Sequence, residues 1–412
     1  MIFMKRWLAI SLCMAMLAGL GGCGGAEAAG VQDLMKKITP KPSAPEALSQ
    51  EDAALLTAAA VKLLQNCEDI SNALLSPLSV LCAVGMTANG ADGRTKAQFE
   101  EYFGMDLAAF DRCMQSWREL QSGKDGLLSA NSIWFHNSEL KVQEQFLQTN
   151  ADYFGADMFE APFDGDTLAE LNRWVSDRTD GRIPEILDEI PENAVMYLVN
   201  ALCFRLDWAE QYTTDKVRSG SFTTENGNER TVEMMSSKEY LYLEDAGTVG
   251  FVKPYIGGQY AFAALLPEEG ISMREFLDGL DGETLFSLLK NRKTENVSVK
   301  LPKFEAEYAA DLCGAFRTVG VTDAFDPDRA DFSGIGTARD NIYISRILHK
   351  TNITVNETGT EAAAATAVEM MTKSARPMRD RSIVLDRPFV YMIVDLETNI
   401  PVFIGTVTDI GN

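Results

Sequence analysis

The segment from Thr360 to Met371 combines carboxylates and small side chains in a pattern that would let one of its faces enter a β-sheet. If this segment is extended, successive side chains point to opposite faces. One face is uncharged and carries Thr360, Ala362, Ala364, Thr366, Val368 and Met370. The other face carries Glu361, Ala363, Ala365, Ala367, Glu369 and Met371, and therefore both charges. Since burying an unpaired carboxylate costs on the order of several kcal/mol, only the uncharged face suits a sheet interior.

This pattern alone is compatible with three structures. An exposed loop with one uncharged face can become an additional strand between two existing strands. The alanine run at residues 362–365 is also good helix sequence, because alanine has the highest intrinsic helix propensity. A low-complexity spacer is the third possibility. The rest of the chain has to decide among them.

Few residues of this chain could support catalysis by a nucleophile or a metal. The sequence contains two histidines, His136 and His349, which lie far apart, and no Cys-x-x-Cys pair. A zinc site of cysteine and histidine therefore has little to build with. His349 could pair with a serine as a catalytic dyad, but no carboxylate stands at a recognisable spacing to orient the imidazole. The sequence predicts no metal and no cofactor, and a hydrolase is the least favoured function.

Motifs along nearly the whole chain resemble the serpin family of protease inhibitors. The hinge that precedes the reactive loop in this family is matched by Glu357, Gly359, Thr360, Glu361, Ala362, Ala363, Ala364, Ala365 and Thr366. Other family motifs follow in the family's order: Leu75–Val80, Ala88–Thr95, Leu171–Val175, Leu198–Ala201, Val232–Met235, Leu301–Phe304, Ala330–Ile335, His349-Lys350, Asp386–Phe389 and Phe403–Gly405. The resemblance implies an α+β serpin fold with three β-sheets, about nine surrounding helices and an exposed reactive loop.

The function implied by this resemblance is suicide-substrate inhibition of serine proteases. A protease attacks a bond in the loop, and the freed loop inserts into the central sheet and traps the acyl-enzyme. Members that do not inhibit commonly carry a charged, bulky or proline residue in the hinge, and Thr360–Ala367 has none on the entering face. A non-inhibitory surface binding protein and an inhibitor of papain-like cysteine proteases are the alternatives.

The resemblance also assigns roles to residues outside the loop. Positions under the central sheet, whose polar side chains must separate when the loop enters, are matched by Ser76, Ser79, Asn200 and His349. Lys303 and Glu357 match an ion pair at the top of the sheet, beside Trp208, and breaking such a part-buried pair on one side costs about a few kcal/mol. Leu206 stands where the family usually has glycine, and Thr358 replaces a charged residue; neither blocks the insertion face.

The position of the reactive bond follows from the hinge. In relatives the attacked residue lies thirteen positions after the hinge threonine, and this count from Thr360 reaches Lys373, followed by Ser374. Arg376 is the runner-up, but Pro377 follows it, and the ring removes an N–H and restricts the preceding backbone. A basic residue before the bond predicts a trypsin-like serine protease as the partner.

The amino terminus has the features of an export signal. Lys5 and Arg6 precede an apolar stretch, Trp7–Leu20, and Leu20-Gly21-Gly22-Cys23 resembles a bacterial lipobox. We expect residues 1–22 to be removed and Cys23 to carry acyl chains. Residues 23–45 are then expected to be a lipid anchor with a flexible tether, followed by a serpin domain at residues 46–412. An ordinary signal peptide with a chance cysteine is the alternative.

Charge and composition limit the partners and the location. The net charge is −23, and removal of residues 1–22 takes away two positive charges and no acid, which leaves −25. Nucleic acid is excluded as a partner by this acidity. No apolar run between Ser49 and Val407 is long enough to span a bilayer. We expect a monomeric, exported lipoprotein in the cell envelope, on the extracellular or periplasmic face, that touches the membrane only through its anchor.

Helical signals concentrate early in the chain and strand signals late, which favours an α+β domain. Helices are expected at Ser49–Gln65, Ser76–Met86, from Thr95 onward, at Leu140–Tyr153 and at Thr167–Thr179. The nearly continuous apolar run Ala194–Leu206 predicts a central strand covered on both faces. Further strands are expected at Tyr260–Leu266, Val297–Leu301, Asn352–Val355, Ser382–Leu385, Phe389–Leu396 and Val402–Val407. The five cysteines of the domain are expected to be buried small hydrophobes.

Overall fold

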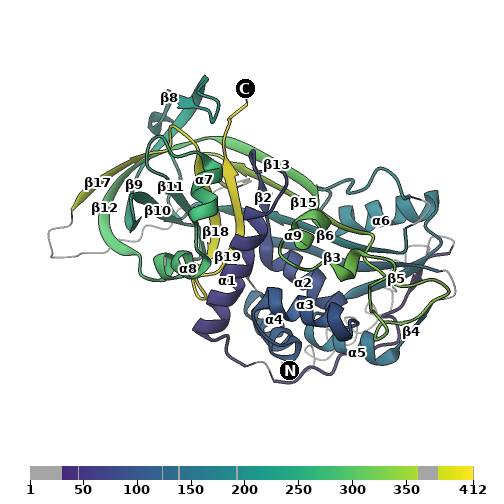
Figure 1. Ribbon diagram of the computed structural model, residues 1–412. Helices are drawn as coiled ribbons and strands as arrows, with labels where there is room; N and C mark the ends of the chain where they lie inside the picture. Colours follow the sequence, from purple (N-terminus) through teal and green to yellow (C-terminus); the bar gives the residue numbers. More distant parts are fainter. Residues whose placement is uncertain are drawn as a thin grey trace, which may run out of the picture.

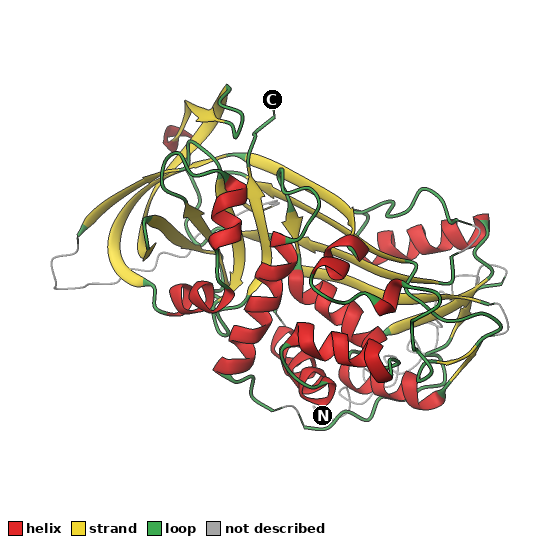
Figure 2. Ribbon diagram, in the orientation of Figure 1, coloured by secondary structure: helices red, strands yellow, loops and turns green. Residues whose placement is uncertain are grey.

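The computed structural model of this protein describes residues 30–44, 46–122, 124–137, 140–191, 194–360 and 379–411. Within these ranges most helices lie below the strands in Figures 1 and 2, and one helix, α6 (Gly165–Arg178), lies on the opposite face of the central sheet. The helices are α1 (Gln50–Gln65), α2 (Pro77–Ala88), α3 (Gly93–Phe103), α4 (Leu107–Gln121), α5 (Glu144–Tyr153), α6 (Gly165–Arg178), α7 (Met273–Gly279), α8 (Gly282–Lys290) and α9 (Cys313–Thr318). Two short 3₁₀ helices lie at Thr214–Lys216 and Asp323–Phe325.

The described strands form three sheets. The central sheet has the order β1 (Gln32–Asp33), β5 (Asp157–Ala161), β3 (Leu127–His136), β6 (Met196–Phe204), β15 (Arg346–Val355), β16 (Gly359–Thr360) and β7 (Leu206–Asp207), and β13 (Phe304–Asp311) also pairs with β15. The second sheet has the order β17 (Asp380–Val384), β12 (Lys293–Pro302), β9 (Glu229–Asp245), β10 (Thr248–Pro254), β11 (Tyr260–Leu266), β18 (Phe389–Asp395), β19 (Pro401–Val407) and β2 (Leu74–Leu75), with β8 (Val217–Thr223) on β9. The third sheet contains only β14 (Gly336–Thr337) and β4 (Lys141–Val142).

The central strand β6 explains how the sheet is covered. All nine of its residues are buried, and it lies between β3 and β15, as the apolar run predicted. On one face, Leu198 and Leu202 belong to the large core cluster that also contains the apolar side chains of α2. On the other face, Tyr197 and Val199 pack in a second cluster with residues of α6. Every residue of α2 is buried, so this helix runs inside the protein beneath the sheet.

Most of the predicted elements are confirmed, and one is wrong in its first turn. The Ser49 and Asp52 side chains form the expected capping box at the start of α1. In contrast, the segment expected to be helical from Leu140 begins with β4 and becomes helical only at Glu144. Pairing of Lys141–Val142 with β14 keeps the backbone extended there, which delays the start of the helix. Strands β12 and β15 are longer than expected.

Residues 30–44 differ from the flexible tether expected for residues 23–45. The strand β1 pairs with β5 and so extends the central sheet by one edge strand. Leu34, Met35 and Ile38 pack against the large core cluster. Farther along, the Lys41 amide donates a hydrogen bond to Asp152 in α5. These contacts make residues 30–44 part of the folded domain, while residues 23–29 lie outside the described part.

The cysteines of the described part fit the sequence analysis. The five thiols, Cys67, Cys82, Cys113, Cys203 and Cys313, are all buried. Burial raises the pKa of the Cys82 thiol to about 12, so this group stays protonated and unreactive. Among the described helices, none combines the length and the apolar character needed to cross a membrane.

Candidate functional site at the top of the central sheet

The hinge is already part of the central sheet. Strand β16 lies between β15 and β7, with Val355 opposite Thr360 on one side and Leu206 opposite Thr360 on the other. Below this point β6 and β15 pair directly with each other, in parallel, from Arg346 and Tyr197 to Asn352 and Cys203. The first residues of the segment that the sequence predicts to insert therefore occupy a strand position above a closed pair of strands.

A tight turn connects β15 to β16, and we call residues 356–358 the hinge turn. The Asn356 side-chain oxygen accepts hydrogen bonds from the Thr358 amide at 2.9 Å, the Thr358 hydroxyl at 2.7 Å and the Gly359 amide at 3.2 Å. Thr358, which departs from the family pattern, thus helps to close the turn. Gly359 is required by space, because a Cβ atom there would lie 2.3 Å from the Leu206 carbonyl oxygen.

Thr360 is fully buried beneath this turn. Its hydroxyl lies 2.5 Å from the hydroxyl of Tyr255, which is also fully buried. Burial raises the pKa of Tyr255 well above its usual value, so the phenol stays neutral and can donate or accept this hydrogen bond. The Tyr255 ring stacks on Trp208 with a centroid separation of 4.6 Å. Tyr255 was not identified from the sequence.

Residues 208–212, which we call the anchor loop, hold the hinge turn through three hydrogen bonds. The Trp208 indole N–H donates to the Asn356 carbonyl at 2.8 Å. The backbone amides of Trp208 and Tyr212 donate to the carbonyl oxygens of Thr358 and Glu357, both at 2.9 Å. The structure therefore places Trp208 directly against the hinge, where the resemblance put it.

Lys303 contacts the hinge turn from the other side. Its ammonium nitrogen lies 2.8 Å from a carboxylate oxygen of Glu357 and 3.0 Å from one of Glu233. Although partial burial opposes the shift, hydrogen bonds to Glu357 and Glu233 raise the pKa of Lys303. The hydrogen bond from Lys303 lowers the pKa of Glu357. Because the two side chains are 24% and 39% exposed, this pair stabilises the fold by about 1 kcal/mol or less, below the few kcal/mol expected for a more buried pair.

Ser79, Asn200 and His349 lie together beneath the pair β6–β15. His349 and Asn200 are opposite each other across these strands, and His349 Nδ1 lies 2.6 Å from the Asn200 side-chain oxygen. The Asn200 amide donates to Ser79 of α2 and to Asn131 of β3. These contacts link β3, β6, β15 and α2. Asn131 was missed, because only the pairing of β3 with β6 brings it opposite Asn200.

The environment of His349 fits a structural role. The backbone amide of Ser76 donates to His349 Nε2 at 3.2 Å, so the bond that a catalytic dyad needs from a serine hydroxyl is replaced by one from a backbone N–H. Burial lowers the pKa of His349 to about 3, and the imidazole is neutral near pH 7. Both Ser76 and His349 are 1% exposed, so a substrate has no access to them.

Several residues of the predicted site lie outside the described part: Glu361, Ala362, Ala363, Ala364, Ala365, Thr366, Lys373, Ser374, Arg376 and Cys23. The described residues on either side show where the loop is attached. It leaves the central sheet at Thr360 in β16 and joins the second sheet at β17, which pairs in parallel with β12. The loop that contains the predicted reactive bond therefore connects two different sheets.

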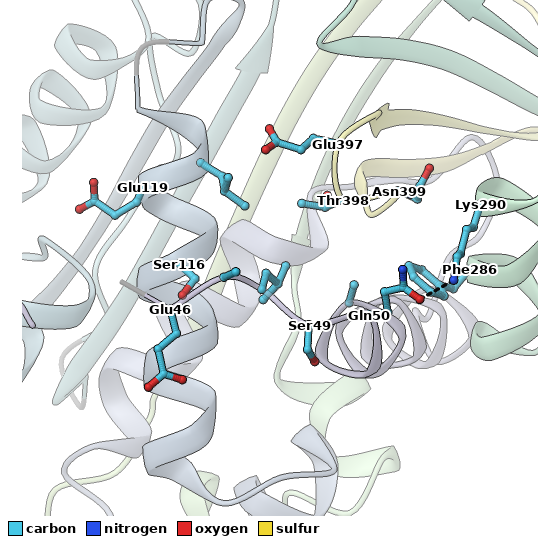
Figure 3. A pocket seen from close by; sticks show the side chains of 14 residues that line it. Glu46, Ser49, Gln50, Ser116, Glu119, Phe286, Lys290, Glu397, Thr398 and Asn399 are labelled. Atoms are coloured by element: carbon cyan, nitrogen blue, oxygen red, sulfur yellow. Dashed lines mark hydrogen bonds between the residues drawn. The ribbon is translucent and has the colours of Figure 1, made fainter. Parts of the chain in front are cut away.

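A cavity of about 480 Å³ lies away from the hinge, where α1, α4, α8 and the turn between β18 and β19 meet (Figure 3). Its lining is mixed: Glu119 and Glu397 contribute carboxylates, Phe286 contributes an aromatic ring, and Lys290 bonds to Gln50. Among the described residues of the predicted site, none lines this cavity.

Comparison with known proteins identifies the fold. A family model described as Serpin (serine protease inhibitor) matches residues 54–410. Leukocyte elastase inhibitor A of Mus musculus is 31% identical over 369 residues, which cover 84% of this chain and 96% of that protein. The crystal structure of the thermophilic serpin tengpin in the native state is 38% identical, covers 92% of this chain and 100% of its own, and has a TM-score of 0.87. Tengpin in the latent state is 37% identical, covers 89% and 100%, and has a TM-score of 0.78. The fold expected from the sequence motifs is confirmed.

Proposed function

Because the chain belongs to the serpin family of protease inhibitors, we propose that it is a suicide-substrate inhibitor of trypsin-like serine proteases. The protease serine attacks the carbonyl carbon of Lys373 and the bond to Ser374 breaks. An acyl-enzyme ester forms on Lys373, and Ser374 becomes a new amino terminus. The freed loop then enters the central sheet before water hydrolyses the ester. In this proposal the protein is an inhibitor and not an enzyme, needs no cofactor and is a monomer.

The observation that carries this proposal is the position of Gly359 and Thr360 between β15 and β7. A strand that continued from Thr360 would run antiparallel to β15 and separate it from β6. Separation breaks the contact between Asn200 and His349, but an inserted strand bonds to neighbours on both sides. About twelve residues then form on the order of twenty backbone hydrogen bonds, each worth ~1 kcal/mol net. This exceeds the stability of a typical protease domain, about 5–15 kcal/mol.

Incubation of the purified protein with trypsin tests the proposal. We expect an SDS-stable covalent complex and a released carboxy-terminal fragment that begins at Ser374. Clean turnover of the protein by trypsin without a complex would overturn the inhibitory function and favour a surface binding protein. Since the mouse relative is named for leukocyte elastase, elastase belongs in the same screen. Papain-like cysteine proteases belong there too, because they would be trapped as thioesters.

We also propose that the protein is an exported lipoprotein held at a membrane through Cys23. The support is the lipobox-like sequence Leu20–Cys23 after an apolar stretch. Labelling of cells with a fatty acid should mark the wild-type protein and leave Cys23→Ala unmarked. Equal labelling of both proteins would remove the basis for the anchor and for a location in the cell envelope.

A further inference from the structure

A buried ion pair lies directly behind the anchor loop. Lys253, in β10, is 2% exposed, and Glu239, in β9, is 6% exposed. The Lys253 ammonium donates a hydrogen bond of 3.0 Å to a Glu239 carboxylate oxygen. The Ser237 hydroxyl donates to the same oxygen at 2.6 Å. A buried pair of this kind is costly to desolvate, and well-packed apolar residues often replace it without loss of stability. Its presence at this position therefore points to a role other than stability.

The Lys253 ammonium contacts the anchor loop in three ways. It donates a hydrogen bond of 3.0 Å to the Glu210 carbonyl oxygen. It also lies 4.5 Å from the centroid of the Tyr212 ring and 5.4 Å from that of Trp208, within the range of cation–π attraction. One buried charge thus fixes the middle and both ends of residues 208–212.

The anchor loop in turn fixes the hinge. Trp208 and Tyr212, the two residues whose rings Lys253 contacts, supply all three hydrogen bonds from this loop to the hinge turn. Trp208 also stacks on Tyr255, which bonds to Thr360. A continuous set of contacts therefore runs from the Lys253–Glu239 pair in the second sheet to the first buried residue of the inserting segment in the central sheet.

We propose that the Lys253–Glu239 pair is a positioning pair for loop insertion, which holds the hinge turn in the geometry from which the new strand grows. Strand β16 is antiparallel to β15, with the register Val355 opposite Thr360. An inserted strand keeps this register as it extends, so a fixed hinge turn supplies the closed end of the hairpin before cleavage. Loss of the pair should release the turn, slow insertion and give the protease time to hydrolyse the ester. This inference rests on the proposed inhibitory function.

The variant Lys253→Met tests the pair, and Lys124→Met is its matched control. Lys124 has a side chain that is 8% exposed and a carboxylate partner, Asp395, that is fully buried, but Lys124 lies between α4 and β3, and Asp395 is the last residue of β18. Both variants leave one buried carboxylate without its lysine. They differ in whether the missing ammonium touches the anchor loop.

The first measurement is hydrogen exchange of the Trp208 and Tyr212 amides, which requires no protease. These amides donate to the hinge turn, so their exchange reports its release. In Lys253→Met we expect exchange to be faster by about tenfold or more, the effect of losing a hydrogen bond to a charged group. Lys124→Met should leave both rates within about twofold of wild type, a change of ~0.4 kcal/mol or less. Unchanged exchange in Lys253→Met, or an equal rise in both variants, would overturn the inference.

The second measurement is the number of inhibitor molecules consumed per trypsin molecule trapped. Lys253→Met should raise this number severalfold, while Lys124→Met should not. Absence of any complex with the wild-type protein would count against the proposed function, and the exchange experiment would still decide whether the pair holds the hinge. If Lys253→Met does not fold, the double variant Lys253→Met/Glu239→Met removes both charges and should restore folding. It should keep the fast amide exchange, because the bond to Glu210 is still missing; wild-type exchange would overturn the inference.

Discussion

The hydroxyl groups of Thr360 and Tyr255 lie 2.5 Å apart in a fully buried position at the top of the central sheet. Thr360 is the first residue of the uncharged face that the sequence predicts to insert, and it is inserted before any protease has acted. Insertion of the loop is then the extension of an existing strand and does not need a new one to start. Changes at this contact should therefore affect inhibition more than they affect recognition by the protease.

Replacement of Thr360 by arginine should turn the inhibitor into a substrate. The site is fully buried and has no acidic partner described next to the Thr360 side chain, so a charged side chain would be expelled together with β16. We expect trypsin to cleave Thr360→Arg at the normal rate with about tenfold or more inhibitor consumed per complex, since a few kcal/mol oppose insertion. Thr360→Ser keeps the hydroxyl group and should behave like wild type. An unchanged stoichiometry for Thr360→Arg would contradict the insertion mechanism.

Gly359→Ala should have a similar effect for a steric reason. The added Cβ would lie 2.3 Å from the Leu206 carbonyl oxygen and 2.6 Å from the Asp207 Cα, and these are backbone atoms that cannot move aside alone. Strand β16 would have to leave β7, and hydrogen exchange of the Thr358 and Gly359 amides should accelerate. The control is Gly314→Ala in α9, where an added Cβ meets no atom within 4 Å. That change should stabilise the protein by up to ~1 kcal/mol and leave inhibition unchanged.

The sequence predicted those elements whose signals are local. The capping box of Ser49 and Asp52 defines the start of α1 within four residues, and the apolar run of β6 identifies a strand covered on both faces. Strand β9 was not predicted, although it has seventeen residues. Its charged side chains, such as Glu233, Lys238 and Glu244, interrupt the apolar pattern. Pairing with β8, β10 and β12 decides its conformation instead.

The candidate site was predictable only where a motif matched. His349, Asn200 and Trp208 were identified by resemblance, because single residues at their positions carry no local signal. Tyr255 was missed because its contact with Thr360 joins residues 105 positions apart, and Lys253 was missed because only the pairing of β9 with β10 brings it to Glu239. The tether interpretation of residues 30–44 relied on composition, whereas the pairing of β1 with β5 depends on a free sheet edge that composition does not reveal.

The stability of the protein should fall in acid because of His349. Its pKa is lowered by burial from 6.5 to about 3 in the folded state. Between these pH values the unfolded chain binds a proton at His349 that the folded protein does not. The contribution of the neutral, buried His349 to the free energy of unfolding is therefore fully present above pH 6.5 and is lost as pH falls toward 3. We expect the free energy of unfolding of wild type, relative to His349→Gln, to decrease by up to ~1.4 kcal/mol per pH unit in this window. Parallel curves for the two proteins would contradict this assignment.

Asp111 should produce the opposite trend and has to be separated from His349. Burial, partly offset by a hydrogen bond from Asn89, raises the pKa of Asp111 from 3.8 to about 7. Its contribution to stability is fully present below pH 3.8 and is lost as pH rises to about 7. Asp111→Asn should therefore lose less stability than wild type between pH 4 and pH 7. Urea unfolding of both single variants and of the double variant over this range isolates each contribution, and an equal pH dependence of Asp111→Asn and wild type would refute the role of Asp111.

The reactive bond can be located by the ends of the fragments that trypsin releases. The loop is attached at Thr360 in the central sheet and at β17 in the second sheet, and Lys373 lies between these points with a small hydroxyl residue after it. A basic side chain is needed to enter an acidic specificity pocket, so Lys373→Ala should abolish the covalent complex with trypsin. Arg376 stays available in this variant, but Pro377 after it makes the bond a poor substrate.

Arg376→Ala is the matched control and should inhibit like wild type. A carboxy-terminal fragment that begins at Pro377, together with loss of inhibition in Arg376→Ala, would move the reactive bond three residues along the loop, from Lys373 to Arg376, and lengthen the segment between Thr360 and the bond by the same three residues.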